Sequence, residues 1–296
     1  MWIQERAAPE QNIRPLQRGA APDGRQLREW VERLAIPRHL FANTSENAWV
    51  RDELAEAFER YGFSVQLQGR YQNVVAVPRT ASTRPLTLIS AHYDSVPDCP
   101  GADDNASGLA VMLECARVLS ENRRGLAVGF ISFNAEEDGL LGSRDFVTHG
   151  LPELHRPVRL THVLEMIGFR ASSVPQRLPL PWAPSRMKVP DFLGLLATGN
   201  SNATVDLAVN SAAAPRLRLL AAKTWGPLHR LLPDLRRSDH FPFWDAGIPA
   251  VLWTDTGNFR NPHYHQATDT PDTLDYTFMR EAAELLCALV SQEEAR

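Results

Sequence analysis

Cysteine is scarce in this chain of 296 residues. Its three cysteines are too few for a disulfide framework, and an odd number cannot all pair. Cys115 shares the apolar face of a predicted helix with Leu109 and Met112, so we interpret it as a small core residue. The N-terminus carries charge early and has no continuous apolar segment typical of a signal peptide. These absences predict a cytoplasmic protein with reduced thiols.

Long apolar runs and an excess of positive charge are also missing. No run approaches the roughly 20 apolar residues that span a bilayer, and a net charge of -4 offers no basic stripe for nucleic acid. We therefore expect neither a membrane nor a nucleic-acid partner, and the residues leave the oligomeric state open. A composition of 44% hydrophobic and 22% charged residues is sufficient for one large core.

The order of the apolar patterns predicts a single α/β domain. Its central, mostly parallel or mixed β-sheet would be flanked by helices on both faces. Residues 1–22 are expected to form an N-terminal arm, and residues 23–296 the domain itself. Helical spacing predicts surface helices over 26–34 and 48–61, and the sheet is predicted to begin at 73–77. Between Gly168 and Pro190, five prolines without periodicity predict a long loop that walls a substrate cleft.

A turn-rich segment after one predicted strand collects groups that suit a metal cation. The apolar run 86–91 leads into a loop that contains His92, Asp94, Asp103 and Asp104. His92 would stand at the strand's end, facing a crevice. One of its ring nitrogens could bind a metal while a carboxylate fixes the other. The alternative for a single His-x-Asp motif is a polar loop in which these side chains only cap and turn.

Further carboxylates follow or interrupt two later strands. Glu136 and Glu137 come after the apolar run 126–133. Because adjacent side chains on an extended segment diverge, one of this pair could bind a metal while the other acts as a general base. The alternative is a solvated loop before a helix, whose N-terminus favours acids. Glu165 interrupts the apolar run 161–168, where a buried carboxylate needs a partner.

The last cluster lies near the C-terminus. The apolar strand 248–253 is followed by the segment Asn261-Pro-His-Tyr-His265, so His265 supplies a second imidazole of the kind that zinc favours. Cys99 could also ligate zinc, but the imidazoles and carboxylates already fill a site of ordinary coordination number. The remaining histidines are interpreted as structural or exposed, and His263 is the hardest of them to set aside.

The order of these segments resembles the M28 family of zinc peptidases, which includes the co-catalytic aminopeptidases. The resemblance covers roughly 86–275 and rests on AHYDS, PGADDNASG, the doubled Glu after a strand, LEMIG, SDHFPFW and the late His before a Thr-Asp-Thr run. It implies a zinc-aminopeptidase-like fold and two zinc ions per chain, with manganese or cobalt as alternative metals. It also implies a peptide or small aminoacyl substrate.

Carried over position by position, the resemblance assigns five metal ligands. Asp104 becomes the carboxylate that bridges the two ions. His92 and Glu165 complete one site, and Glu137 and His265 complete the other.

The same resemblance assigns roles around the metals. Glu136 becomes the general base, and Asp94 the orienting partner of His92. Tyr264 is expected to place its hydroxyl against the tetrahedral intermediate, and Asp103 is left as a supporting residue.

This chain departs from the family pattern at two places. Glu165 stands where many aminopeptidases have Asp. The resemblance therefore does not fix the geometry of the amine-binding side of the pocket. The segment 233–237 lacks the disulfide-supported tyrosine of some relatives, so Tyr264 would have to serve instead. Asp239 and His240 match a polar pair near the family's active site.

Three competing functions remain. A glutaminyl cyclase-like transferase would share the fold. The presence of a complete second ligand set, His92 with Glu165, favours a two-metal hydrolase instead. An M20-like peptidase or deacylase usually carries an inserted dimerisation domain, for which this chain has no room. A non-catalytic binding protein would have no need of the general base and all the ligands.

The direction of cleavage depends on which end of the substrate is recognised. Asp103, Glu136 and Glu165 offer a pocket for a free α-amine, so an aminopeptidase is expected. A carboxypeptidase would instead need a cation for the substrate carboxylate, and the candidates for that role are Arg236, Arg237 and Arg260.

Overall fold

A nine-stranded mixed sheet runs through the molecule in the order β1-β8-β7-β9-β6-β4-β5-β3-β2. The computed structural model describes residues 1–6, 20–80, 82–121, 126–171, 173–177, 188–226 and 228–294. The strands are β1 (Trp2–Arg6), β2 (Phe63–Gln68), β3 (Asn73–Pro78), β4 (Leu86–His92), β5 (Val128–Phe133), β6 (Val158–Glu165), β7 (Phe192–Thr198), β8 (Arg218–Thr224) and β9 (Ala250–Thr254).

The centre of the sheet is parallel. Strands β5, β4, β6 and β9 run in one direction, whereas β7 and β8 are parallel to each other and antiparallel to β9. Strands β1, β2 and β3 pair antiparallel at the two edges. The carboxyl ends of the four central strands therefore meet at one edge of the sheet, where open α/β sheets bind their ligands.

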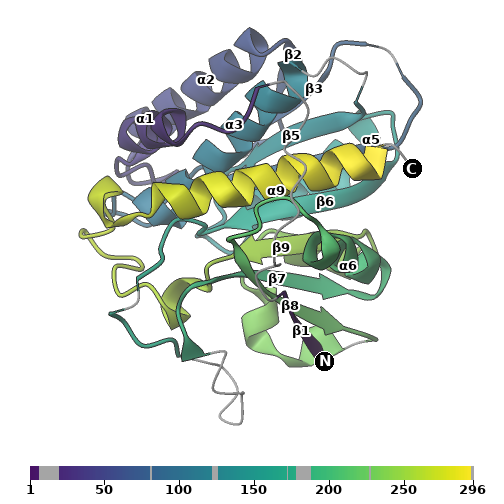
Figure 1. Ribbon diagram of the computed structural model, residues 1–296. Helices are drawn as coiled ribbons and strands as arrows, with labels where there is room; N and C mark the ends of the chain where they lie inside the picture. The colour runs from purple at the N-terminus through teal and green to yellow at the C-terminus, as the bar shows by residue number, and fades with distance from the viewer. Residues whose placement is uncertain are drawn as a thin grey trace.

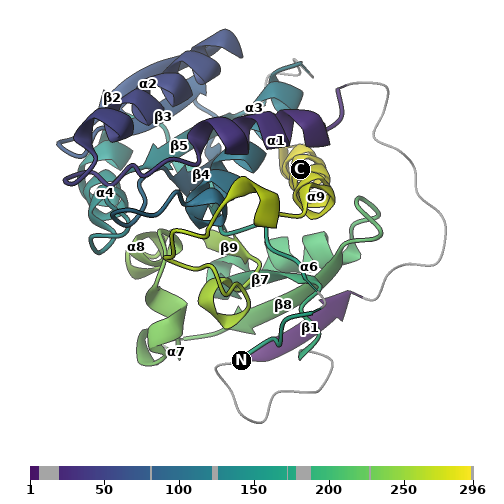
Figure 2. The same ribbon diagram turned by 90° about the vertical axis from the view of Figure 1, so that its left-hand side faces the viewer.

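Helices cover both faces of the sheet. In the view of Figure 2, the sheet separates α1, α3 and α9 from α4 and α8. The helices are α1 (Gly24–Leu34), α2 (Thr44–Arg60), α3 (Gly108–Glu121), α4 (Leu141–Asp145), α5 (Leu151–Glu153), α6 (Asn202–Asn210), α7 (Leu228–Leu231), α8 (His240–Asp245) and α9 (Tyr276–Glu294). Figure 1 shows α9, in yellow, lying across the sheet below α1 and α3.

Alternation along the strands produces one apolar core on each face. Phe130 of β5 packs in the core beneath α1, α2, α3 and α9, and its neighbour Ile131 packs in the core beneath α8. Val74 and Val75 of β3 divide in the same way. All of β4 is buried because both of its faces are covered.

The predicted fold class is confirmed, and two details of it are wrong. The sheet does not begin at Asn73, because β1 and β2 precede β3 in the chain. Trp2–Arg6, expected within an arm, pairs instead with β8 as an edge strand. That partner lies more than 200 residues away, so local patterning could not indicate it. Residues 7–19 lie outside the described ranges, and the domain boundary after residue 22 stays a prediction.

The predicted helices correspond to α1 and α2, each of which begins a few residues earlier than expected. Three cysteines are free and buried, and Cys115 packs in the main core as predicted. Within the described ranges, no helix is both long and apolar enough to cross a membrane.

Candidate metal centre

The predicted ligands converge on the carboxyl edge of the parallel strands. His92 is the last residue of β4 and Glu165 the last of β6. Glu137 follows the end of β5, and His265 lies in the loop after β9. Asp104 belongs to a π-helical turn, Ala102–Ser107, that leads into α3.

Two groups of potential metal ligands share Asp104. His92 Nε2 lies 3.1 Å from Asp104 Oδ1 and 3.4 Å from Glu165 Oε1. His265 Nε2 lies 3.2 Å from Asp104 Oδ2 and 3.1 Å from Glu137 Oε2. The two oxygens of Asp104 therefore face different imidazoles, as a bridging carboxylate would require.

The donor atoms suit divalent ions. Imidazole nitrogen and carboxylate oxygen are ligands of zinc, and also of manganese or cobalt. Bonds of about 2.0–2.2 Å in a tetrahedral site hold ligand atoms about 3.3–3.6 Å apart, close to the 3.1–3.4 Å separations here. Glu137 Oε1 is a buried atom without a hydrogen-bond partner in the described structure, and Asp104 Oδ1 and His265 Nε2 have only the contacts within the two ligand groups. Such atoms are rare unless they bind something, so these residues fit two cations that share Asp104.

Electrostatics at the site also favour a cation. Burial would lower the pKa of His265, but contacts with Asp104 and Glu137 outweigh it and raise that pKa to about 10. Burial would lower the pKa of His92 too, and the charges of Glu165 and Glu136 reverse the effect. The carboxylates thus draw protons onto both imidazoles, and divalent ions can take the place of those protons.

The pKa of Asp104, which faces both imidazoles, shifts in the opposite direction. Burial would raise the pKa of Asp104, but its contacts with His265 and His92 hold that pKa below its ordinary value. Glu137 differs, because burial and the charge of Asp104 raise its pKa to about 7. Asp104 is therefore the carboxylate most firmly held in its ionised form.

Asp94 connects the two sides of the site. Its Oδ1 lies 3.4 Å from His92 Nδ1 and accepts the backbone N–H of Glu136 at 3.1 Å. Its Oδ2 accepts the backbone N–H of Glu137, also at 3.1 Å. The residue predicted to orient His92 therefore fixes the acidic pair as well.

Three supporting residues were not assigned a role from the sequence. Asp269 accepts the backbone N–H groups of Asp103 and Asp104, and Ser238 Oγ donates to Glu165 Oε2 at 2.6 Å. Arg38, fully buried, donates to the carbonyls of the loop between His92 and Asp104. Asp269 and Ser238 lie inside the segments that carried the family resemblance, whereas Arg38 lies in a segment without a signal.

Asp103 points away from the metal groups. Its Oδ1 accepts the backbone N–H of Gly168 at 2.8 Å, and its Oδ2 accepts from Asn261 Nδ2 at 2.7 Å. It does not line the cavity at the site. The expectation that Asp103 helps to bind a substrate amine is therefore wrong, because its oxygens hold neighbouring loops together.

A cavity of about 570 Å³ opens beside the metal groups. Asp104, Glu136, Glu137 and Glu165 line one end of it. Its floor is an apolar face of the sheet formed by Ile3, Phe192, Leu196, Leu220 and Leu252. From the loop predicted to wall a substrate cleft, Gln176 and Arg177 line the cavity, while residues 178–187 lie outside the described ranges.

Tyr264 lies next to the second metal group. Its ring stacks on the ring of His265 with centroids 3.7 Å apart, and its hydroxyl accepts from Arg237 Nη2 at 3.0 Å. Burial, with the nearby charges of Asp104 and Glu137, raises the pKa of Tyr264. The hydroxyl therefore keeps its proton and can donate a hydrogen bond into the cavity.

Two residues that the sequence left open fall outside the metal groups. The Cys99 thiol contacts the carbonyl of Gln266 at 3.1 Å, and burial raises its pKa to about 12. Such a thiol is a poor metal ligand, because the thiolate is the form that binds. His263 Nδ1 pairs with Thr268 Oγ1 at 2.9 Å. Of the polar pair after Ser238, Asp239 is fully buried and His240 lines the cavity.

An open α/β sheet with clustered imidazoles and carboxylates at its carboxyl edge is the architecture of a metal-dependent hydrolase. The chain belongs to peptidase family M28, whose model matches residues 73–290. It is a peptidase of this zinc-dependent family.

Relatives and solved structures agree with that membership. Escherichia coli YfbL, itself uncharacterized, is 34% identical, over 75% of this chain and 71% of its own length. Bacillus subtilis aminopeptidase YwaD is 30% identical, over 74% of this chain, but the match spans only 44% of YwaD. The Legionella pneumophila LapA aminopeptidase has the same fold, with a TM-score of 0.71 at 20% identity, covering 93% of this chain and 73% of LapA.

Proposed function

We propose that this chain is a two-metal aminopeptidase that removes N-terminal residues from peptides. The observation that carries the proposal is Asp104, whose two oxygens face His92 on one side and His265 on the other. Glu165 would complete the first ligand set and Glu137 the second. Divalent ions bound there would lower the pKa of a shared water toward about 7 and polarise the scissile carbonyl.

Glu136 would act as the general base. It lines the cavity beside both ligand groups but belongs to neither of them. Burial raises its pKa well above the ordinary value, and the charges of Glu165 and Glu137 add to the effect. A carboxylate with a raised pKa can take a proton from water and return it to the leaving amine. Asp94 fixes its position through the backbone N–H.

Tyr264, stacked on His265, would support the same reaction. Its protonated hydroxyl can donate to the oxygen on which negative charge develops. Arg237, which donates to that hydroxyl, would strengthen it as a donor.

The aminopeptidase direction rests on the charges around the ligands. Glu136 and Glu165 both line the cavity and can pair with a substrate α-ammonium group. Arg260, one candidate for binding a carboxylate, is buried and donates to Gln176, so it is not free to bind substrate. Arg236 and Arg237 do line the cavity.

The alternatives make different demands on the site. A glutaminyl cyclase-like transferase needs an electrophilic metal, but unlike a peptidase it does not split a peptide bond and release a shortened peptide. A binding protein on this fold needs no base at Glu136. An M20-like enzyme usually has a second domain, and the described sheet carries no inserted domain.

A pentapeptide with an apolar N-terminal residue tests the proposal. The protein, loaded with zinc, cobalt or manganese, is assayed with the free peptide, its N-acetylated form and its C-terminally amidated form. Acetylation should abolish hydrolysis, and amidation should have little effect. Rapid hydrolysis of the acetylated peptide, together with strict dependence on a free C-terminus, would contradict the aminopeptidase assignment.

A further inference from the structure

Four arginines line the cavity but belong to neither metal-ligand group: Arg144, Arg177, Arg236 and Arg237. We call them the arginine rim. All four are exposed residues. Among the described residues, neutral groups and not carboxylates make most of the contacts with their side chains, so their positive charge is largely uncompensated.

The first pair of the rim converges on Asn258. Arg237 Nη1 donates to Asn258 Oδ1 at 3.1 Å, and Arg177 Nη2 donates to the backbone carbonyl of the same residue. The only carboxylate near Arg237 among the described residues is Asp234, at 4.0 Å with both side chains more than 40% exposed. An ion pair this long and exposed neutralises little charge.

The second pair converges on an aromatic ring. The guanidinium carbon of Arg236 lies 4.7 Å from the ring centroid of Phe241, and that of Arg144 lies 5.9 Å from it. Arg144 also donates to the carbonyl of Gly139. No carboxylate in the described part of the chain forms an ion pair with either residue. Four like charges that line one cavity and are held by an amide, a ring and carbonyls favour an anion in that cavity.

The rim stands close to the place where a peptide bond would be cleaved. Arg237 donates to the Tyr264 hydroxyl at 3.0 Å, and the Tyr264 ring stacks directly on His265. One aromatic ring therefore separates the guanidinium from the second metal group. Each extended residue advances a chain by about 3.3–3.6 Å. A carboxylate one or two residues beyond the scissile bond would reach the rim, and that of a longer peptide would pass it.

We propose that the arginine rim binds the C-terminal carboxylate of dipeptides and tripeptides, which makes very short peptides the preferred substrates. This inference rests on the proposed aminopeptidase function and adds its substrate class. Glu136 and Glu165 would pair with the α-ammonium group, the apolar floor would hold the N-terminal side chain, and the rim would hold the other end. Arginine suits this role because its planar fork binds a carboxylate through two N–H groups.

The test compares free acids with their amides at several lengths. The kcat/KM values of metal-loaded protein are measured for leucyl-leucine and leucyl-leucinamide, and for the matching tripeptide and pentapeptide pairs. The ratio of acid to amide should be about tenfold or more for the dipeptide, as expected for a charge-assisted pair. It should fall to about one for the pentapeptide.

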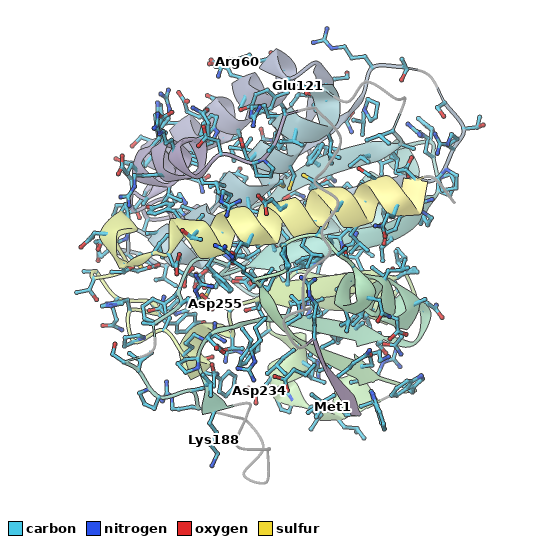
Figure 3. The ribbon with its side chains drawn as sticks, viewed as in Figure 1. Met1, Arg60, Glu121, Lys188, Asp234 and Asp255 are labelled. Carbon is cyan, nitrogen blue, oxygen red and sulfur yellow. The ribbon has the colours of Figure 1, made fainter. Side chains whose placement is uncertain are left out.

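Variants locate the effect. Arg177→Gln and Arg237→Gln should each reduce the acid-to-amide ratio for the dipeptide several-fold. Arg177 is the cleaner probe, because it has no contact with Tyr264 in the described structure. Arg60→Gln is the matched control and should keep the wild-type ratio, since Arg60 lies at the opposite end of the molecule from Asp234 (Figure 3).

Three outcomes would overturn the inference. They are equal rates for the dipeptide acid and amide, an unchanged ratio in both rim variants, and faster hydrolysis of leucyl-glutamic acid α-amide, whose side-chain carboxylate is free, than of leucyl-leucine. The last would mean that the rim recognises acidic side chains. None of these contradicts the proposed function, which is tested separately by the N-acetylated and C-terminally amidated pentapeptides.

Discussion

Asp269 accepts the backbone N–H of Asp104 at 3.1 Å, so the residue that faces both imidazoles is fixed through its main chain. The same carboxylate accepts the N–H of Asp103. Burial and the nearby charge of Asp103 raise the pKa of Asp269 to about 7. A carboxylate tolerates that environment because it is satisfied by backbone donors.

Asp269→Asn should weaken zinc binding by about 10–100-fold, the usual effect of removing a group that orients a ligand. The amide retains one acceptor oxygen but turns an N–H₂ toward a backbone donor. Isothermal titration with zinc measures the change. Asp272→Asn is the control, since Asp272 is exposed and pairs only with Thr270 nearby. Equal affinity of both variants would show that Asp269 has no role in placing Asp104.

Asp104→Ala should remove both metals at once, because its two oxygens face both ligand groups. His265→Ala should mainly weaken one site and leave the other occupied. Elemental analysis of the purified variants gives the metal content. Retention of two ions per chain by Asp104→Ala would rule out the bridging assignment.

Glu136→Gln and Glu137→Gln separate the base from the ligand. Glu136→Gln should keep its metals and lose turnover by about 10²–10⁴-fold, the usual contribution of a general base. Glu137→Gln should lose metal as well as turnover, because Glu137 Oε2 faces His265. Metal content and kcat are measured on the same preparations, and the reverse pattern would exchange the two roles.

Arg38→Ala should destabilise the protein by at least about 3 kcal/mol. The guanidinium is fully buried and donates to the carbonyls of Tyr93, Pro100 and Gly101. Each carbonyl left buried without a donor costs about 1–3 kcal/mol. Urea unfolding measures the change, and Arg60→Ala should stay within about 0.5 kcal/mol of wild type because Arg60 is exposed. A comparable loss in both variants would contradict the role given to Arg38.

The fold could be predicted where its signals are local. Strand β4 is a continuous apolar run that ends at His92, and the residue order in the later loops resembles one family. Strand β2 does carry a local signal, because Phe63–Gln68 alternates apolar and polar residues strictly, and the sequence interpretation missed it. Strand β1 depends on a partner more than 200 residues away, which local patterning cannot indicate.

The candidate site shows the same division. The structure brings together the five predicted ligands because they follow strand ends that share one edge of the sheet. Asp103 has the supporting role that the resemblance implied, but its expected part in binding a substrate amine was wrong, because adjacent residues of one motif can turn to opposite sides of a loop. The role of Arg38 was not predicted, and neither was the grouping of the four arginines of the rim. In both cases tertiary contacts alone bring the residues together. The cytoplasmic location stays a prediction.

Anomalous X-ray scattering at the zinc edge, from crystals grown with zinc, tests the two-metal centre most directly. The arrangement of His92, Glu165, Glu137 and His265 around Asp104 predicts two peaks per chain, about 3.5–4 Å apart, one on each side of the Asp104 carboxylate. A single peak, or two peaks that do not share Asp104, would contradict the account.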